Sequence, residues 1–355
     1  MVVRLIPWSV TLSQQTDHSN YLSKKVASAN GNGRRATKQG CVRTRRPQIL
    51  PSTNYGESIS GLRVFVLSDL HTDYPENMNW VKCLSTVRHK EDVLLVAGDV
   101  AETYKNFILT MSLLKDRFQH VFYVPGNHDL WCRWEKDDEL DSLEKLNRLL
   151  DACTRLEVQT KPMVIDGLGI IPLFSWYHES FDREKDITGV RMLSLEMACK
   201  DFHACKWTGE LSKADSSLAS YFDAMNEKTQ DRIDEIQRSK LLQYTGEISF
   251  MPEQSLRWCE QVYWISEEDW QELCPEKRML FYPNLPKIIG SDFLEARIRS
   301  IHGLEGSASA CHVFGHTHFC WDAVLDGIRY VQAPLAYPRE RKRRMNGGCS
   351  WRSWR

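Results

Sequence analysis

Residues 62–71 read Leu-Arg-Val-Phe-Val-Leu-Ser-Asp-Leu-His, an apolar run of β-branched and aromatic residues that ends in polar side chains. Such a run is typical of a buried strand followed by a loop. The pattern returns at residues 93–97, which precede Gly98-Asp99, and at residues 121–124, which precede Pro125-Gly126-Asn127-His128-Asp129. Stretches with helical spacing separate these runs. Alternating strands and helices predict βαβ units and a largely parallel sheet that is buried on both faces.

Two later segments repeat the same arrangement. Residues 168–174 predict a strand that leads into Ser175-Trp176-Tyr177-His178, and residues 312–314 predict one that leads into Gly315-His316-Thr317-His318. Asp326-Gly327 between two apolar runs predicts a type I′ hairpin.

Four polar clusters therefore follow predicted strands, namely Asp69-x-His71, Gly98-Asp99, Gly126-Asn127-His128-Asp129 and Gly315-His316-Thr317-His318. The ligand crevice of an open α/β sheet lies at the carboxyl ends of its strands. Each glycine taken alone is an ordinary turn residue, and two histidines flanking one residue are a moderate metal signal. Carboxylate, amide and imidazole groups with no thiolate suit a divalent ion such as Mn, Fe or Zn. The four clusters together predict a metal site.

The set of clusters resembles the signature of the calcineurin-like metallophosphoesterases, which is D-x-H, G-D, G-N-H-[DE], a lone His and then G-H-x-H. The resemblance extends from about residue 62 to residue 332. It implies an α/β fold of four layers, in which two mixed sheets pack face to face as a sandwich flanked by helices. A dinuclear metal site would lie at the carboxyl ends of the strands. This implied fold replaces the single doubly covered sheet with two sheets.

The same resemblance implies a ligand set for two divalent metal ions, with Mn, Fe and Zn as candidates. One ion would be held by Asp69, His71 and His318 together with Asp99. Asp99 would bridge to the second ion, which would also take Asn127 and His316. A shared carboxylate is needed because two divalent ions roughly 3.5–4 Å apart repel each other. The ions would hold the phosphoryl oxygens and a hydroxide that attacks phosphorus, so the implied activity is hydrolysis of a phosphate ester.

Three further residues receive roles beside the metals. His128 would donate a hydrogen bond to the phosphate and protonate the leaving oxygen, and Asp129 or a nearby carboxylate would orient it. We also predict that His178, which follows Ser-Trp-Tyr, lies at the rim of the crevice and contacts substrate.

The family's lone His is missing at its expected place. An apolar strand is present at residues 248–250, but Met251-Pro252-Glu253 follows and no histidine occurs before His302. Residues 251–270 have the composition of an insertion, as a splice variant or a mispredicted exon would produce. Two functions stay open: a phosphoesterase, impaired by a weak second metal site, or a catalytically impaired protein that uses the fold as a binding scaffold.

The context of the motifs separates the chain from the protein serine/threonine phosphatases. Residues 68–71 read Ser-Asp-Leu-His and not Asp-x-His-Gly, and Gly98-Asp99 continues with Val100 and not with Arg-Gly. The resemblance is therefore to the small-molecule branch, whose substrate is a phosphodiester or a phosphomonoester. The sequence names no protein partner.

Composition excludes several other classes of protein. The chain has 355 residues, 42% of them hydrophobic, and 46 Lys+Arg balance 47 Asp+Glu. These values exclude collagen-like and fully disordered chains and argue against general nucleic-acid binding. No apolar run of about 18 residues predicts a membrane span. Eleven cysteines without a Cys-x-x-Cys pair favour a reducing compartment.

The two ends of the chain differ from the middle. Residues 1–60 hold nine basic and two acidic side chains among many Ser, Thr, Asn and Gly, so we predict a disordered leader with the character of a transit peptide. This leader favours a plastid or mitochondrion, and otherwise the cytoplasm. Residues 61–338 form the predicted phosphoesterase domain, with a polar helical insertion at 190–245. Residues 339–355 are predicted to be a disordered basic tail.

Overall fold

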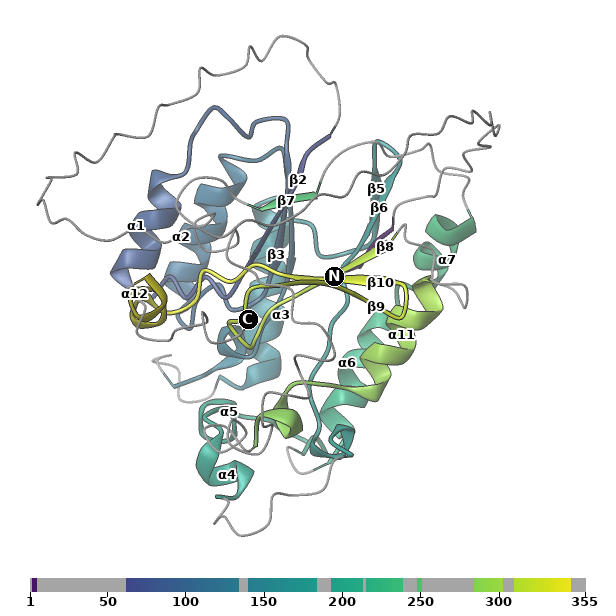
Figure 1. The fold of residues 1–355 in the computed structure, drawn as a ribbon. Coiled ribbons are helices and arrows are strands. Elements are labelled where there is room, and N and C mark those ends of the chain that lie inside the picture. Colours follow the sequence, from purple (N-terminus) through teal and green to yellow (C-terminus); the bar gives the residue numbers. More distant parts are fainter. Residues whose placement is uncertain are drawn as a thin grey trace, which may run out of the picture. The chain divides into compact units, whose positions relative to one another are not determined.

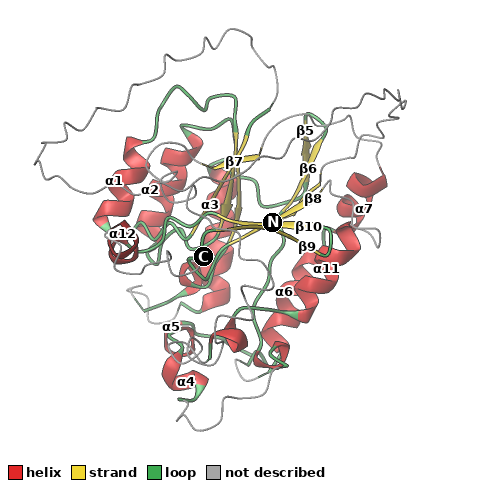
Figure 2. Ribbon diagram, in the orientation of Figure 1, coloured by secondary structure: helices red, strands yellow, loops and turns green. Residues whose placement is uncertain are grey.

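The structure is a computed structural model, and it describes most of the chain beyond residue 61. The described residues are 2–4, 62–133, 140–183, 193–212, 215–238, 248–250, 284–302 and 310–345. They belong to one structural unit, which consists of residues 1–7 and 61–355. Two sheets and the helices beside them make up the described part (Figures 1 and 2). No helix among these residues is both long and apolar enough to cross a membrane.

The first sheet contains the strands that the opening sequence pattern predicts. They are β2 (Val64–Ser68), β3 (Val93–Ala97), β4 (His120–Val124) and β7 (Ile248–Phe250). Their order is β4-β3-β2-β7, and every pairing is parallel. Strands β2 and β3 are buried along their whole length, because layers cover both faces of this sheet.

Three helices cover the outer face of the first sheet, namely α1 (Pro75–Cys83), α2 (Tyr104–Lys115) and α3 (Ser142–Arg155). Helix α3 begins with a capping box, in which Asp141 accepts from the backbone of residue 144 and the Glu144 side chain accepts from the Asp141 backbone. Phe65, Leu94 and Tyr123 of the sheet pack with apolar residues of these helices in one buried cluster.

The second sheet is mixed. Its strands are β5 (Met163–Ile165), β6 (Leu168–Ile171), β1 (Val2–Arg4), β8 (Ala310–Phe314), β10 (Ile328–Gln332) and β9 (Trp321–Leu325), in that spatial order. β8 and β10 are parallel, and the other neighbours are antiparallel. Asp326 and Gly327 join β9 to β10 with φ values of 50° and 79°, so the predicted type I′ hairpin is confirmed.

The inner faces of the two sheets pack against each other. Val66 and Leu95 of the first sheet share a buried cluster with Ile170, Val313 and Val331 of the second sheet. Backbone also joins the sheets, because Ser68 N donates to Ala333 O at 3.0 Å. The implied sandwich is therefore confirmed.

Helices also cover the outer face of the second sheet (Figure 1). Ile233 and Ile236 of α7 (Gln230–Arg238) and Ile298 of α11 (Asp292–His302) pack there with Ile171 and Ile328. The fold thus has four layers: helices, sheet, sheet, helices. The remaining helices are α4 (Leu195–Ala198), α5 (Asp201–Ala204), α6 (Ser217–Glu227), α7 (Gln230–Arg238), α11 (Asp292–His302) and α12 (Pro338–Met345), with 3₁₀ turns at His128–Leu130, Glu179–Phe181 and Leu285–Ile288.

Two boundaries differ from the prediction. Residues 2–4, expected in a disordered leader, form strand β1 between β6 and β8, where the sheet has space for one more hydrogen-bonded strand. Residues 338–345, expected largely in a disordered tail, form helix α12, because tertiary contacts hold a segment whose composition alone predicts solvation. The described part of the segment at 190–245 contains helices α4, α5, α6 and α7 with loops between them. The rest of both ends and the atypical segment 251–270 lie outside the described residues.

Candidate active site

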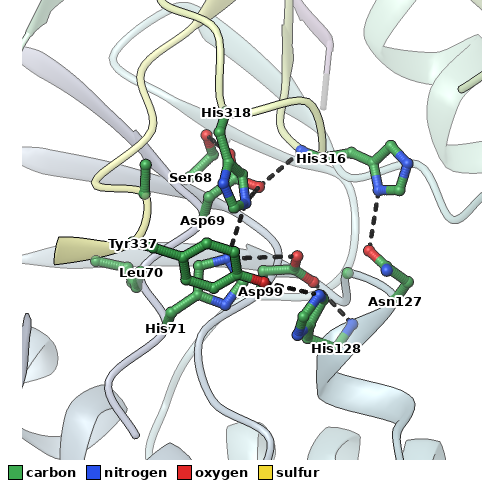
Figure 3. A network of polar contacts seen from close by, with 12 residues as sticks. Ser68, Asp69, Leu70, His71, Asp99, Asn127, His128, His316, His318 and Tyr337 are labelled. Atoms are coloured by element: carbon green, nitrogen blue, oxygen red, sulfur yellow. Dashed lines mark hydrogen bonds and ion pairs between the residues drawn. The ribbon is translucent and has the colours of Figure 1, made fainter. Parts of the chain in front are cut away.

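The four polar clusters meet at one end of the sandwich. Asp69 and His71 follow β2, Asp99 follows β3, and Asn127 follows β4, so parallel strands deliver them to the same edge of the first sheet. His316 and His318 arrive there from β8 of the second sheet, which the packing of the two sheets brings over this edge. Figure 3 shows these side chains turned toward one another.

Four side chains form a buried carboxylate–imidazole group. Asp69, His71, Asp99 and His318 each offer one ligand atom, and these atoms all lie within 4.8 Å of one another. His71 Nε2 lies 2.9 Å from His318 Nε2 and 3.8 Å from Asp99 Oδ2. His318 Nε2 lies 3.6 Å from Asp69 Oδ1. We call these four residues the metal cluster.

The donor atoms of the metal cluster fit a divalent transition ion. Two ligands roughly 2.1 Å from an ion and at right angles to each other lie about 3.0 Å apart, and the two Nε2 atoms are separated by nearly this distance. Two carboxylates and two imidazoles without a thiolate suit Mn, Fe or Zn. The group as folded can therefore hold such an ion.

A second donor group adjoins the metal cluster through Asp99. His316 Nδ1 lies 3.0 Å from Asn127 Oδ1, and both residues line one pocket together with Asp99. Gly126 makes this arrangement feasible, because a Cβ at that position would lie 2.1 Å from Asp99 Oδ1. The pairing of these three residues matches the second ligand set that the resemblance implies, without the additional histidine.

The backbone of the site is strained at the residues that carry its donors. Asp69, His71, Asp99, His316 and His318 have φ values of 51°, 44°, 53°, 86° and 59°. Non-glycine residues seldom adopt this left-handed region, and such strain concentrates at functional sites. Neighbouring contacts hold the geometry in place: His71 N donates to Asp99 O at 2.9 Å, and His316 N donates to Asp69 Oδ1 at 2.7 Å.

Burial destabilises the charged forms of the side chains in the metal cluster when no counter-ion lies beside them. Burial lowers the pKa of His71 well below its usual value, and the neighbouring His128 and His318 lower it further. Burial likewise raises the pKa of Asp99 well above its usual value, with the nearby Asp69 carboxylate adding to the shift. A bound divalent ion would favour neutral imidazole and ionised carboxylate, which are its ligand forms.

His128 lies beside the metal cluster on a stack of aromatic rings. Its ring packs on Trp131 at 3.6 Å between centroids. Its Nε2 lies 3.3 Å from Tyr337 Oη, and its Nδ1 lies 3.5 Å from Glu102 Oε1. Burial lowers the pKa of His128, while the Glu102 carboxylate opposes that shift. The ring is therefore held in a fixed orientation with one nitrogen toward a carboxylate.

The Asp129 carboxylate does not take the orienting role that the sequence analysis offered it. Asp129 Oδ1 accepts from Val100 N and Ala101 N at 2.8 and 3.1 Å. Its Oδ2 accepts from Gly126 N and Tyr123 Oη at 2.9 and 2.8 Å. Asp129 thus ties the loop after β3 to the loop after β4.

The other alternative, a nearby carboxylate, corresponds to Glu102 at the start of the segment before α2. Arg133 donates to both Glu102 oxygens, with Nη2 to Oε1 at 2.8 Å and Nε to Oε2 at 3.0 Å. Burial alone would raise the Glu102 pKa, but hydrogen bonding to His128 and Arg133 lowers it to about 2. Glu102 is therefore ionised beside His128 at neutral pH.

A buried carboxylate that the sequence analysis missed fixes the Asn127 amide. Asp201 Oδ1 accepts from Asn127 Nδ2 at 2.9 Å and from Trp131 Nε1 at 2.6 Å, and its Oδ2 accepts from Tyr177 Oη at 2.9 Å. Holding Nδ2 in this way leaves Asn127 Oδ1 to face His316. The acid lies in the polar insertion at 190–245, and nothing in that composition distinguishes it from surface acids.

Helix α12 supplies two further groups that the sequence analysis missed. Tyr337, just before the helix, places its ring 4.4 Å from the ring of His71, and its hydroxyl reaches His128. Glu340 Oε2 lies 2.9 Å from His318 Nδ1, on the side of the ring opposite to Nε2. A carboxylate behind a metal-ligating imidazole fixes the ring and raises its basicity.

His178 does not lie where the sequence analysis placed it. Its side chain is buried, with Nδ1 2.9 Å from Ser180 Oγ and Nε2 accepting from Asp292 N at 3.3 Å. Phe181 and Phe293 pack edge-on to its ring. Its polar atoms thus join the segment after β6 to the start of α11, and the predicted substrate contact stays a prediction. The preceding Tyr177 is the residue that approaches the site, with its ring 6.1 Å from that of His316.

Comparison with known proteins agrees with this geometry. A family model described as calcineurin-like phosphoesterase matches residues 62–214. The chain is 25% identical over 306 residues to the acyl-carrier-protein phosphodiesterase PptH of Mycobacterium tuberculosis, covering 79% of this chain and 80% of that protein. The crystal structure of phosphopantetheinyl hydrolase PptH from the same organism has a TM-score of 0.51 at 22% identity, covering 81% of this chain and 94% of the other. The structural likeness shows a shared fold.

The two stacked sheets and the donor groups at their strand ends define the class of calcineurin-fold hydrolases. Residues 62–214 match a calcineurin-like phosphoesterase domain, and the similarity to PptH is to a phosphodiesterase. The chain is a hydrolase that acts on ester bonds, and its described residues include a candidate ligand group for a divalent metal.

Proposed function

We propose that the protein hydrolyses a small-molecule phosphodiester with the help of two divalent metal ions, for which Mn, Fe and Zn are the candidates. The observation that carries the proposal is the convergence of the ligand atoms of Asp69, His71, Asp99 and His318 within 4.8 Å. His128 lies beside this group. Its backbone N donates to Asp99 Oδ1 at 2.9 Å, and its Nε2 lies 3.3 Å from Tyr337 Oη. A proton donor and a metal cluster are thus held together.

One set of residues would bind the metal ions, and another would transfer the proton. The metal cluster would hold one ion, and Asp99 with Asn127 and His316 would hold the other. Bound divalent ions would neutralise phosphoryl oxygens and acidify an attacking water. The water oxygen bonds to phosphorus and one P–O ester bond breaks, so an alcohol leaves and a phosphate monoester stays.

His128 is the residue proposed to give the leaving oxygen its proton. Its ring is fixed by Trp131, and ionised Glu102 at Nδ1 favours the imidazolium, whose second proton lies on Nε2. Tyr337 Oη at Nε2 occupies the direction from which a substrate oxygen would accept this proton. After the alcohol has left with this proton, the imidazole is neutral, and the Glu102 carboxylate favours its reprotonation from solvent.

The relative with 25% identity supports a phosphodiester over a phosphomonoester. Its name assigns to it an acyl-carrier-protein diester, and the solved structure is that of a phosphopantetheinyl hydrolase. We extend the chemistry to this chain: the substrate is a phosphodiester of which one alcohol is pantetheine-like.

Hydrolysis of methyl p-nitrophenyl phosphate and of p-nitrophenyl phosphate by the purified full chain tests the proposal. Activity is measured with Mn²⁺, Fe²⁺ or Zn²⁺ and after chelation, with Asp99→Asn as the inactive control. We expect Mn²⁺-dependent release of p-nitrophenol from the diester that falls at least 100-fold in Asp99→Asn, because a bridging ligand is lost. Equal activity in the variant, or equal activity after chelation, would contradict it.

The scaffold function remains the second candidate, because no histidine follows strand β7 before His302. Residues 251–283 lie outside the described part of the chain. Metal analysis separates the two candidates: one ion per chain with no turnover favours the scaffold, and two ions with turnover favour the enzyme. Sequencing the transcript across codons 245–275 tests whether this segment is a splice variant.

Localisation to a plastid or mitochondrion stays a proposal that rests on residues 1–60, and imaging of a C-terminal fluorescent fusion tests it.

A further inference from the structure

A pocket of about 480 Å³ begins at the second donor group and leads away from it. Asp99, Asn127 and His316 line its inner end. From there it continues over Leu173 and Ser175 toward α11. Its volume lies within the roughly 300–1,000 Å³ that small-molecule sites occupy.

The pocket runs between α11 and the second sheet. Phe314 of β8 and Tyr330 of β10 form the sheet wall, while Leu294 and Ile298 form the helix wall. Val313, Ala97 and Val124, which belong to the cluster between the two sheets, also line the pocket. The cavity exists because α11 approaches this end of the sheet without filling it.

One hydroxyl in the pocket lining is buried and has no partner within the described part of the chain. Ser291 is 4% exposed, and its Oγ has no hydrogen-bond partner among the described residues. A buried hydroxyl without a partner costs stability, so natural proteins keep one where it serves a ligand or a water. Away from the second donor group, the lining combines apolar side chains with polar residues, namely Ser175, Tyr177, Glu295, His312 and Tyr330.

We propose that this pocket binds the arm of the substrate that stays attached to phosphorus. The inference rests on the proposed phosphodiesterase function. The arm's chemical class is a neutral, extended chain of methyl and methylene groups interrupted by amides, as in phosphopantetheine. Apolar walls receive the hydrocarbon parts, and the Ser291 hydroxyl pairs with an amide.

The position of the pocket also decides which ester bond breaks. His128 and Tyr337 are not among the residues that line it. In Figure 3, Asn127 and His316 lie on one side of the site and Tyr337 lies on the other. An arm in the pocket therefore stays on phosphorus as the phosphate monoester, and the alcohol on the His128 side takes a proton from the imidazole and leaves. A bulky leaving alcohol needs no pocket on that side.

Two chromogenic diesters with the same leaving group test the proposal. One is methyl p-nitrophenyl phosphate, and the other carries pantetheine in place of methyl. We expect the pantetheinyl ester to have a kcat/KM at least tenfold higher in the wild-type chain, because the arm adds binding energy that methyl cannot supply.

Leu294→Trp narrows the pocket and Ala296→Trp is its matched control, since Ala296 is exposed on the same helix and does not line the pocket. Leu294→Trp should remove most of the advantage of the pantetheinyl ester, about tenfold in kcat/KM, and leave the methyl ester within about twofold. Ala296→Trp should change neither ester. An equal fall for both esters in Leu294→Trp, or no change for either, overturns the proposal.

Ser291→Ala provides a second test that does not depend on tolerance of a large side chain. Removing an unpaired buried hydroxyl should leave the melting temperature unchanged or raise it. The same change should raise KM for the pantetheinyl ester about three- to tenfold and leave the methyl ester unchanged. A lower melting temperature with equal effects on both esters would assign Ser291 a purely structural role.

Binding distinguishes failure of the pocket from failure of the proposed function. If the wild-type chain hydrolyses the methyl ester but gives the pantetheinyl ester no advantage, the pocket proposal fails and the phosphodiesterase function stands. If neither ester is hydrolysed, that function fails, and calorimetric titration of the Mn²⁺-loaded full chain with phosphopantetheine decides the pocket. Binding that weakens about tenfold in Leu294→Trp and not in Ala296→Trp supports the pocket; equal or undetectable binding in all three chains overturns it.

Discussion

At the scale of single residues, the site depends on carboxylates that stand behind its imidazoles. Glu340 lies 2.9 Å from His318 Nδ1, and Glu102 lies 3.5 Å from His128 Nδ1. Each acid leaves the other ring nitrogen to face the site, so the two histidines are oriented by groups that touch neither metal nor substrate.

Glu340→Gln is expected to weaken binding of Mn²⁺ about tenfold, because a neutral amide makes His318 a less basic ligand. The amide oxygen still accepts from Tyr337 N, so the start of α12 stays capped. Isothermal titration calorimetry of the metal-free chain measures the change. Lys342→Gln, an exposed position on the same helix, is the control. Unchanged affinity in Glu340→Gln would mean that the carboxylate does not act through His318.

The lowered pKa of Glu102 predicts that the free energy of unfolding decreases at acid pH. Its pKa is lowered from 4.5 to about 2 in the folded state, so its charged form stabilises the fold above pH 4.5 and this contribution is lost as pH falls toward 2. Glu102→Gln should cost about 1 kcal/mol at pH 7, a value reduced for partial solvent screening. Urea unfolding at several pH values should show the difference between wild type and variant shrinking below pH 4.5. A difference that is constant from pH 7 to pH 3 would contradict the assignment.

At the scale of elements, Asp129 joins two of the loops that carry the site. Its four hydrogen bonds connect the loop after β3, which carries Asp99, to the loop after β4, which carries Asn127. Both loops follow neighbouring parallel strands, so the sheet brings them close and Asp129 sets their spacing.

Asp129→Ala should lower the free energy of unfolding by about 3 kcal/mol, because four donors, including the buried Tyr123 hydroxyl, lose their acceptor. Chemical denaturation of the metal-free chain measures the loss without interference from metal binding. Asp151→Ala, at an exposed position of α3, is the control and should change stability by less than about 0.5 kcal/mol. A similar small loss in both variants would show that the loops hold their spacing without Asp129.

At the scale of the whole molecule, the second sheet is completed by residues from the start of the chain. Val2, Val3 and Arg4 pair with both β6 and β8, so β1 lies inside the sheet and not at an edge. β8 in turn carries the loop of His316 and His318. The first residues of the chain therefore support the strand that delivers half of the histidines of the site.

Val3→Pro should destabilise the protein by about 3 kcal/mol, since proline removes a backbone donor and is excluded from interior strands. Val3→Thr keeps the strand geometry and serves as the control. Thermal melts of the two full-length variants measure the difference. If both melt together with the wild type, β1 does not contribute to the folded sheet, and removal of residues 1–60 as a transit peptide would be structurally harmless.

Much of the fold and site could be predicted from local pattern. The apolar runs at 62–67, 93–97 and 121–124 fixed three parallel strands, because a strand buried on both faces needs a continuous apolar sequence. The polar groups after these runs had to share one edge, since parallel strands end on the same side of a sheet. The metal cluster itself, as a candidate, follows from the motifs and the family resemblance.

Long-range contacts decided the rest, because their partners are far apart in sequence and ordinary in composition. Glu340 in a basic segment, Asp201 in a polar one and Tyr337 near the end of the described chain gain their roles only from what they touch. His178, which looked like a rim residue, is buried because α11 packs against it.

The sequence by itself thus determined the strand ends and the identity of the donor side chains, since both depend on neighbours along the chain. Only the tertiary structure decided which carboxylate stands behind each histidine, where β1 inserts, and that α11 leaves a pocket beside Asn127 and His316. These features depend on how the two sheets and their helices pack, and packing brings together residues that no local pattern connects.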